Sequence, residues 1–75
     1  MSLTEQIERT TWNQKITMLR NIQGLTQKQF ADKIGTTPKN LWMWELGKSY
    51  PRESSKKAIA RACNVKESEI FMATK

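Results

Sequence analysis

Glycine and proline residues divide this sequence into segments that are each only long enough for a short helix. They stand at Gly24, Gly35, Pro38, Gly47 and Pro51. Between them, apolar residues recur at three- and four-residue intervals, and no stretch shows the sustained alternation that a half-buried strand requires. The sequence therefore predicts an all-α fold built from several short helices.

Capping signals and apolar spacing predict five helices. Thr26 and Thr37 are predicted N-caps, because each precedes a helical pattern and carries a hydroxyl that can accept from an unpaired amide. Pro38 suits a first helical position, where its missing amide hydrogen would be unpaired anyway. The predicted helices cover residues 11–23, 27–34, 38–46, 55–63 and 67–71.

A chain of 75 residues fits one domain with one core. We assign residues 11–75 to this domain and residues 1–10 to an N-terminal segment. In that segment, Ser2 with Glu5 predicts a capping box, and Leu3 and Ile7 predict an extra helical turn. The expected core residues are Trp12, Ile16, Leu19, Ile22, Phe30, Ala31, Ile34, Leu41, Trp44, Ala58, Ile59, Ala62, Cys63, Val65, Ile70 and Phe71.

The chain is strongly basic, with 13 Lys and Arg against 7 Asp and Glu, a formal charge of +6 and a pI near 9.8. This balance favours a polyanionic partner, either nucleic acid or a membrane surface. No segment approaches the roughly 18 apolar residues of a spanning helix, and the first residues lack the layout of a signal peptide. We therefore expect a soluble cytoplasmic protein.

The residue types that carry most catalysis and metal binding are scarce. Cys63 is the only cysteine and there is no histidine, so neither an internal disulfide nor the usual zinc site can be assembled. The acidic residues are scattered singly, which gives little support for general acid–base chemistry. We expect a protein that is not an enzyme and that binds neither metal nor cofactor.

Residues 26–46 have the pattern of two short helices joined by a tight turn, as in a DNA-reading helix pair. The string LTQKQFADKIGTTPKNLWMWELGKSYP, followed by IARACNVKESEIF, resembles the Cro and phage-repressor family of helix-turn-helix domains, also called the xenobiotic-response-element (XRE) family. The resemblance covers about residues 13–71. It implies a compact, five-helix, lambda-repressor-like domain whose recognition helix, residues 38–46, lies in the DNA major groove. The matching positions are Leu25, Thr26, Gln27, Ala31, Gly35, Trp44, Glu45, Gly47, Pro51, Ile59, Ala60, Ala62, Val65, Ile70 and Phe71.

The sequence departs from the family pattern near its fourth helix. Lys56 and Lys57 stand where the family often has leucines, and Lys66 stands where it usually has a capping Ser or Asp. We therefore expect a thinner core beneath this helix. Trp12 or Tyr50 is predicted to fill the space.

The outward face of the predicted recognition helix supplies the candidates for reading bases. With Leu41 and Trp44 turned inward, a helical repeat leaves the remaining positions facing out. Lysine can donate to guanine and asparagine can pair with adenine, whereas Trp42 and Met43 can offer only apolar contact, for example to a thymine methyl. The base-contact candidates are Thr37, Pro38, Lys39, Asn40, Trp42 and Met43.

Trp42 has a second interpretation, because a large ring at an outward position seldom stays uncovered in a protein without a partner. It either contacts DNA or packs against the loop around Tyr50 or a symmetry mate. The sequence leaves these alternatives equally open.

Phosphate contacts are expected from groups that flank the recognition helix. The candidates are Gln27, Lys48, Ser49, Tyr50 and Arg52, with Asn40 as a further one. Lys28, Lys33, Lys56, Lys57 and Arg61 are predicted to be ordinary solvated charges that raise the local field. The resemblance also places Arg20 beside Glu45, as a structural ion pair that orients the recognition helix.

The sequence thus predicts a transcriptional regulator, most simply a repressor, that binds double-stranded DNA. Because so small a module makes few base contacts, we expect a homodimer that reads an inverted-repeat operator. The apolar residues Leu3, Ile7, Phe71 and Met72 are candidates for the dimer interface. The alternative is a protein-interaction module of antitoxin or anti-repressor type that grips its partner with Trp42 and Met43. RNA binding is weaker still, because no rows of exposed aromatic residues on a sheet are expected.

Overall fold

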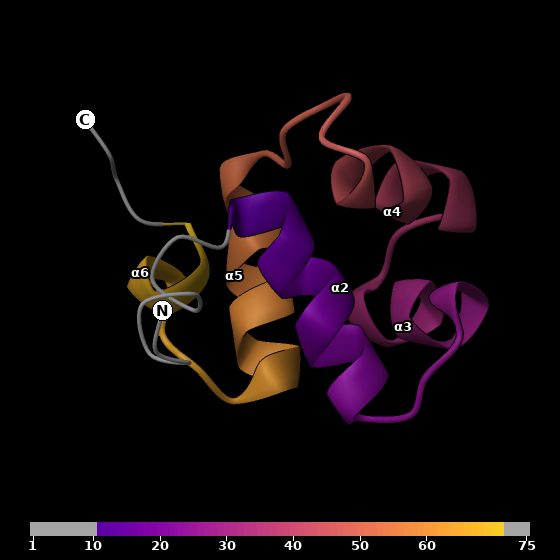
Figure 1. Ribbon diagram of the computed structural model, residues 1–75, viewed down its shortest axis with the longest axis horizontal. Coiled ribbons are helices and arrows are strands. Elements are labelled where there is room, and N and C mark those ends of the chain that lie inside the picture. Colours follow the sequence, from indigo (N-terminus) through magenta and orange to yellow (C-terminus); the bar gives the residue numbers. More distant parts are fainter. Residues whose placement is uncertain (1–10, 72–75) are drawn as a thin grey trace, which may run out of the picture.

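Five short helices, without a strand, make up residues 11–71, the part of the chain that the computed structural model describes (Figure 1). The all-α prediction is confirmed. Three predictions lie outside the described residues: the capping box at Ser2, the helical turn with Leu3 and Ile7, and the dimer contact of Met72. The helices are α2 (Trp12–Ile22), α3 (Gln27–Ile34), α4 (Pro38–Glu45), α5 (Glu53–Cys63) and α6 (Glu67–Ile70).

The predicted N-caps of the helix-turn-helix are present. The Thr26 hydroxyl accepts a hydrogen bond of 3.1 Å from the Gln29 backbone amide, and Gln29 Oε1 accepts one of 2.9 Å from the Thr26 backbone amide, which completes a capping box. At the start of α4, the Thr37 hydroxyl accepts from the Asn40 amide at 3.1 Å, and Pro38 occupies the first turn. These local bonds explain why the two helices begin where the sequence predicts.

Helix α4 ends at Glu45, one residue earlier than expected, in a Schellman motif. Gly47 adopts a left-handed conformation with φ of 75°. The Gly47 amide donates to the Trp44 carbonyl and the Lys48 amide to the Met43 carbonyl, each at 2.9 Å. This motif turns the chain sharply into the α4–α5 loop (residues 46–52).

The bounds of the other helices differ slightly from prediction. Helix α5 begins at Glu53, two residues before the predicted start, and its N-cap Arg52 makes no side-chain capping bond. The carboxylate of Glu53 in the first turn favours this earlier start, because it faces the positive end of the helix dipole. Helix α6 stops at Ile70, and its N-cap Lys66 also lacks a side-chain capping bond.

Helices α2 and α5 lie at the centre of the domain, with α3 and α4 on one side and α6 on the other (Figure 1). One core joins them, and most of the predicted residues lie in it. The buried members of the cluster are Ile16, Phe30, Ala31, Leu41, Trp44, Ile59, Ile70 and Phe71. Within residues 11–71, no helix is long and apolar enough to cross a membrane.

Three core assignments need correction. Ile22 was expected inside but is 75% exposed. Six residues at 100° each place it about 120° around α2 from the buried Ile16, so it leaves the core face. Ala60 is buried although the sequence pattern did not select it. Cys63 was expected to be buried and is only partly so.

Aromatic rings and Lys56 cover the core beneath α5. The Trp12 ring meets Tyr50 edge-on at 4.9 Å between centroids and lies 6.2 Å from Phe71. Trp12 thus packs where the thinner core was expected, while Tyr50 remains 54% exposed. Lys56 is not an ordinary solvated charge. Its side chain is only 19% exposed and its ammonium lies 5.2 Å from the Tyr50 ring centroid.

Candidate nucleic-acid interface

Helix α4 is anchored by one face and exposed on the other. Leu41 is fully buried and Trp44 nearly so, because they lie three residues apart on the side that faces α2 and α3. The opposite side carries the sequence-predicted base-contact residues. Thr37, Pro38, Lys39, Asn40 and Trp42 are exposed, and Met43 is partly exposed.

The two polar candidates differ in their present contacts. Within residues 11–71, Lys39 has neither a hydrogen-bond nor an ion-pair partner, so its ammonium is available to a ligand. The Asn40 side chain instead donates from Nδ2 to the Thr36 hydroxyl at 3.1 Å. Asn40 would have to turn away from Thr36 before it could pair with both edge atoms of an adenine.

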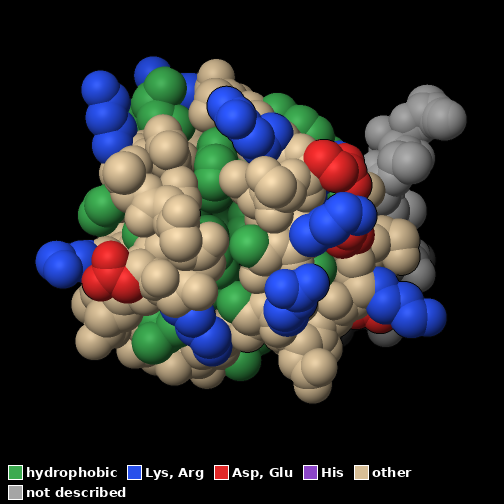
Figure 2. Space-filling model, turned by 180° about the vertical axis from the view of Figure 1, so that it is seen from behind, with side chains coloured by type: hydrophobic (Ala, Val, Ile, Leu, Met, Phe, Trp, Pro, Cys, Tyr) green, Lys and Arg blue, Asp and Glu red, His purple; other side chains and the backbone are tan. Residues whose placement is uncertain are grey.

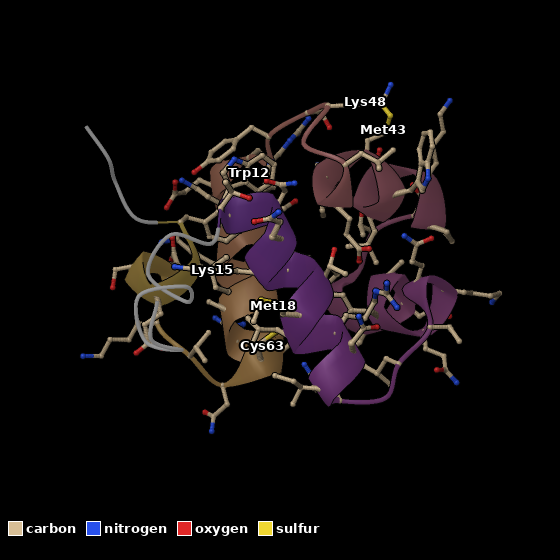
Figure 3. All side chains as sticks on the ribbon, viewed as in Figure 1. Trp12, Lys15, Met18, Met43, Lys48 and Cys63 are labelled. Atoms are coloured by element: carbon tan, nitrogen blue, oxygen red, sulfur yellow. The ribbon has the colours of Figure 1, made fainter. Side chains whose placement is uncertain are left out.

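Trp42 keeps 45% of its surface exposed. The Tyr50 ring packs on Trp12 and Phe71 and makes no aromatic contact with Trp42 in the described chain. The alternatives that Trp42 packs against the rest of the loop around Tyr50, or against a second copy, stay predictions. In Figure 3, Met43 and Lys48 project from the same end of the domain, away from α6.

A polar network fixes the buried side of α4. Arg20 lies against Glu45 in the two-pronged arrangement that the family resemblance implies, with Nε 2.7 Å from Oε2 and an Nη2–Oε1 bond of 3.1 Å. The two side chains are 14% and 7% exposed. Arg20 also donates from Nη1 to the Leu25 carbonyl at 2.9 Å, which ties the start of the helix-turn-helix to the same network.

Gln27 belongs to this network, although we expected it to contact phosphate. Its Nε2 donates to Glu45 Oε1 at 3.1 Å, and the side chain is partly buried. One side-chain amide hydrogen of Gln27 is thus already used in a bond within the domain. Phosphate contact by its other amide hydrogen, or by its backbone amide, stays a prediction.

Asn13 is a member of the network that sequence reasoning missed. Its Nδ2 donates to the backbone carbonyl of Glu45 at 3.1 Å, across 32 positions of sequence. A polar residue in the first turn of a helix has many possible roles, and nothing in the local pattern indicates this long-range contact.

The basic residues near α4 differ in how far they are neutralised. Lys28 pairs with Asp32, and Lys56 and Lys57 pair with Glu53. The hydrogen bond between Lys56 and Glu53 is the main cause that lowers the pKa of the Glu53 carboxyl and raises the pKa of Lys56. The pKa of Lys57 is raised chiefly by its hydrogen bond to Glu67, and less by Glu53. On the face seen in Figure 2, Lys and Arg side chains clearly outnumber acidic ones.

The charges left without an acidic partner include those beside the exposed face of α4. Within residues 11–71, Lys39, Lys48 and Arg52 form no ion pair. Ser49 and Tyr50 are exposed in the same α4–α5 loop. The arrangement offers unneutralised donors at both ends of an exposed helix, which suits a ligand that carries regularly spaced negative charge.

Comparison with known proteins agrees with this geometry. The helix-turn-helix family profile matches residues 16–70, which include all of α3 and α4. The chain belongs to the Cro and phage-repressor (XRE) helix-turn-helix family. It is also 34% identical over 60 residues to the HTH-type transcriptional activator BcrR of Enterococcus faecalis. The match covers 80% of this chain and 29% of that relative.

The family assignment confirms the fold class and the coarse function predicted from the sequence. This helix-turn-helix domain takes part in DNA binding and transcription regulation. Because the match covers only 29% of the relative, the relative's name is evidence about the shared helix-turn-helix domain alone.

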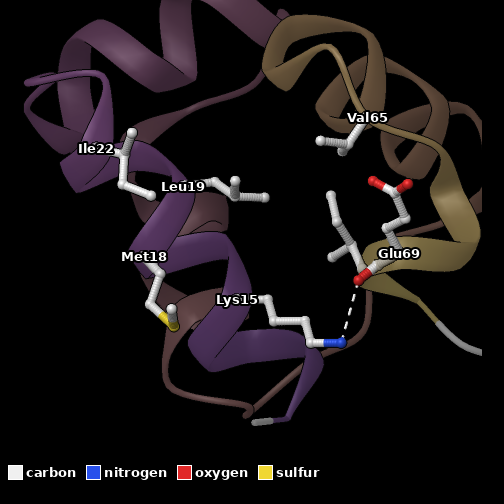
Figure 4. A pocket seen from close by; sticks show the side chains of 7 residues that line it. Lys15, Met18, Leu19, Ile22, Val65 and Glu69 are labelled. Atoms are coloured by element: carbon white, nitrogen blue, oxygen red, sulfur yellow. Dashed lines mark hydrogen bonds between the residues drawn. The ribbon is translucent and has the colours of Figure 1, made fainter. Parts of the chain in front are cut away.

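On a different face, the helix-turn-helix domain has a small apolar groove between α2 and α6 (Figure 4). Its volume is about 190 Å³. The Lys15 side chain extends across one end of the groove, and its ammonium donates to the backbone carbonyl of Glu69 at 3.1 Å. The lining residues are Lys15, Met18, Leu19, Ile22, Val65, Glu69 and Ile70. None of them belongs to the predicted DNA-contact set.

Proposed function

We propose that this domain is a sequence-specific repressor of transcription that reads the major groove of double-stranded DNA with α4. The observation that carries the proposal is the division of α4 into a buried face with Leu41 and Trp44 and an exposed face with the predicted reading residues. Such a helix is fixed in place yet open to a ligand along one side. Helix-turn-helix proteins insert a helix of this kind into the major groove.

The proposed reading face combines one available donor with apolar surface. Lys39 is suited to guanine, because its ammonium can donate to both acceptors on the major-groove edge. Trp42 and Met43 are suited to thymine methyl groups. Thr37 and Pro38 form the end of the helix that enters the groove, and Asn40 contributes if it leaves Thr36.

The proposed phosphate contacts hold the helix in register without choosing a sequence. Lys48 and Arg52 supply unpaired positive charge, and Ser49 and Tyr50 supply exposed hydroxyls from the same loop. Gln27 adds amide hydrogens at the start of α3, where the helix dipole favours an anion.

We propose that two copies bind an inverted repeat, with their recognition helices about 34 Å apart along one side of the DNA. Phe71 is not available for the dimer interface, because it is 7% exposed and packs in the core. Leu3, Ile7 and Met72, the other candidates, lie outside the described residues. Repression follows most simply, since a bound dimer can exclude polymerase without any further contact.

Selection of bound duplexes from a random-sequence pool, carried out at two salt concentrations, tests this function. The expected result is a short inverted repeat, bound with an affinity that falls steeply as salt rises because phosphate contacts release counterions. A reporter gene behind the selected sequence then separates repression from activation. Recovery of no preferred duplex at low salt would refute sequence-specific binding.

A protein-interaction role is the second candidate, and the exposed apolar side chains on α4 favour it. Trp42 is 45% and Leu46 50% exposed, and they lie four residues apart, so they are neighbours on the surface. Failure of the duplex selection, together with loss of partner capture on Trp42→Ala, would support this role over DNA reading.

A further inference from the structure

The backbone carbonyl of Glu45, in the last turn of α4, is not used by the Schellman motif. Gly47 and Lys48 donate to the carbonyls of Trp44 and Met43. The carbonyl of Glu45 is left for another donor, as is usual in the last turn of a helix. Asn13 provides that donor from α2, with an Nδ2–O distance of 3.1 Å.

The Asn13 amide is held in the orientation that this bond needs. The Thr11 hydroxyl donates to Asn13 Oδ1 at 2.7 Å, which directs Nδ2 toward α4. Thr11 is itself fixed as the N-cap of α2, in a capping box with Gln14. The donor is therefore preorganised by the first turn of α2.

The same turn of α2 touches the α4–α5 loop at two more places. A Cβ added to Gly47 would lie 3.4 Å from Asn13 Nδ2, so the Asn13 amide is in close contact with the turn that opens the loop. Near the other end of the loop, the Trp12 ring packs edge-on against Tyr50 at 4.9 Å. Lys48 and Ser49 lie between these two contacts.

We infer that Asn13 is a positioning residue for DNA binding, which holds the α4–α5 loop so that Lys48 and its neighbours meet the phosphate backbone. The inference rests on the proposed function. The Asn13 amide is engaged by Thr11 and by the Glu45 carbonyl, and Asn13 is not one of the proposed base-contact residues. Its loss should therefore weaken binding to every sequence alike, and leave the preferred sequence unchanged.

The test uses Asn13→Asp in the full chain, with Asn13→Ala as a second variant. Aspartate has the same shape but no hydrogen to donate, and its charge favours the N-terminal turn of α2, so that helix should stay intact. The control is Gln14→Glu, which adds the same charge one residue later and keeps a side-chain acceptor for the capping box. Comparison of the two charged variants isolates the bond to Glu45.

Affinities for a selected duplex and for an unrelated duplex are measured over a range of salt concentrations. We expect Asn13→Ala to weaken both by about threefold to tenfold, the size of one lost hydrogen bond. We also expect the salt slope to fall, as it does when a phosphate contact is lost. Asn13→Asp should weaken binding more than Gln14→Glu. In a Lys48→Ala background, Asn13→Ala should cost less than in the parent.

Two results would overturn the inference. One is a change in sequence ranking, which would show that Asn13 acts on the reading face of α4. The other is a lower melting temperature with unchanged affinity and salt slope, which would show a purely structural role. If the parent protein binds neither duplex, the proposed function itself fails, and that outcome is distinct from both.

Discussion

Arg20 and Glu45 lie 25 positions apart in the sequence, yet their side chains meet through two hydrogen bonds, of 2.7 and 3.1 Å. Gln27 donates to the same carboxylate and Asn13 to the backbone carbonyl of the same residue. Glu45, the last residue of α4, therefore accepts hydrogen bonds from both α2 and α3. Together with the buried Leu41 and Trp44, these bonds to Glu45 orient α4.

Glu45→Gln should destabilise the domain by about 3 kcal/mol, because it leaves the largely buried Arg20 charge without a counter-charge. Urea unfolding measures the change. Asp32→Asn is the matched control, since Lys28 and Asp32 are 78% and 67% exposed and their pair should contribute less than about 1 kcal/mol. Similar losses in the two variants would show that the Arg20–Glu45 pair behaves as a surface contact.

Lys39 and Lys48 should affect DNA binding in different ways, although both are exposed lysines without an ion-pair partner in residues 11–71. Lys39→Ala should relax the sequence preference, because the side chain is placed to read a base. Lys48→Ala should weaken binding to all duplexes alike and reduce the salt slope by about one unit. Parallel duplex selections with the two variants check this. Equal loss of preference in both would show that the assigned roles are wrong.

The thymine methyl group provides a direct test of Trp42. Replacement of thymine by uracil in the selected duplex removes that methyl without altering base pairing. We expect about a fourfold loss of affinity for each contacted position, the size of one buried methyl or methylene group. Trp42→Ala should lose this difference at the thymine positions that Trp42 contacts, and keep it at any position that Met43 contacts.

Met18→Ala is the control for this experiment, because Met18 is exposed to a similar degree but lies on α2, in the groove beside α6. It should keep the parent's preference for thymine. If the parent protein binds the uracil duplex as well as the thymine duplex, Trp42 does not read methyl groups.

Local chemistry explains which features were predictable from the sequence. Helix caps and turns act on backbone groups within a few residues, so they can be predicted from the sequence without knowledge of the fold. This applies to Thr26, Thr37, Pro38 and Gly47. Helix periodicity likewise identified most of the core. It selected Ile22 wrongly because three-residue steps rotate gradually off the buried face.

Long-range contacts explain what was not predictable. The partners of Asn13 and Gln27 come from α4, whereas Lys56 meets Glu53 of its own helix, Tyr50 of the α4–α5 loop and Phe71 just after α6. By its local pattern, each of these three residues would suit solvent equally well. Lys56 in particular stands where the family pattern has a leucine, and its ammonium lies 5.2 Å from the Tyr50 ring centroid and 5.8 Å from that of Phe71. Only the packed arrangement of α2, α4 and α5 shows these roles.

The Cys63 thiol should make the free energy of unfolding depend on pH. Burial raises the pKa of this thiol, while a hydrogen bond from Gln23 and the charge of Lys33 act in the opposite direction. Below the thiol's unfolded pKa, near 8.5, both states are protonated and nothing is lost. Between the unfolded pKa and the higher folded pKa, the unfolded state alone gains from ionisation, so the free energy of unfolding should fall as pH rises.

Urea unfolding between pH 7.5 and 10, compared with Cys63→Ala, isolates the contribution of this thiol from that of the rest of the protein. The parent should lose more stability than the variant across this interval, because only the parent has a thiol to ionise. Iodoacetamide at pH 8.5 should also modify the folded protein more slowly than the chain in denaturant, since the thiolate is the reactive form. Equal modification rates in the two states would mean that the thiol is fully accessible, which contradicts the partial burial that raises its pKa.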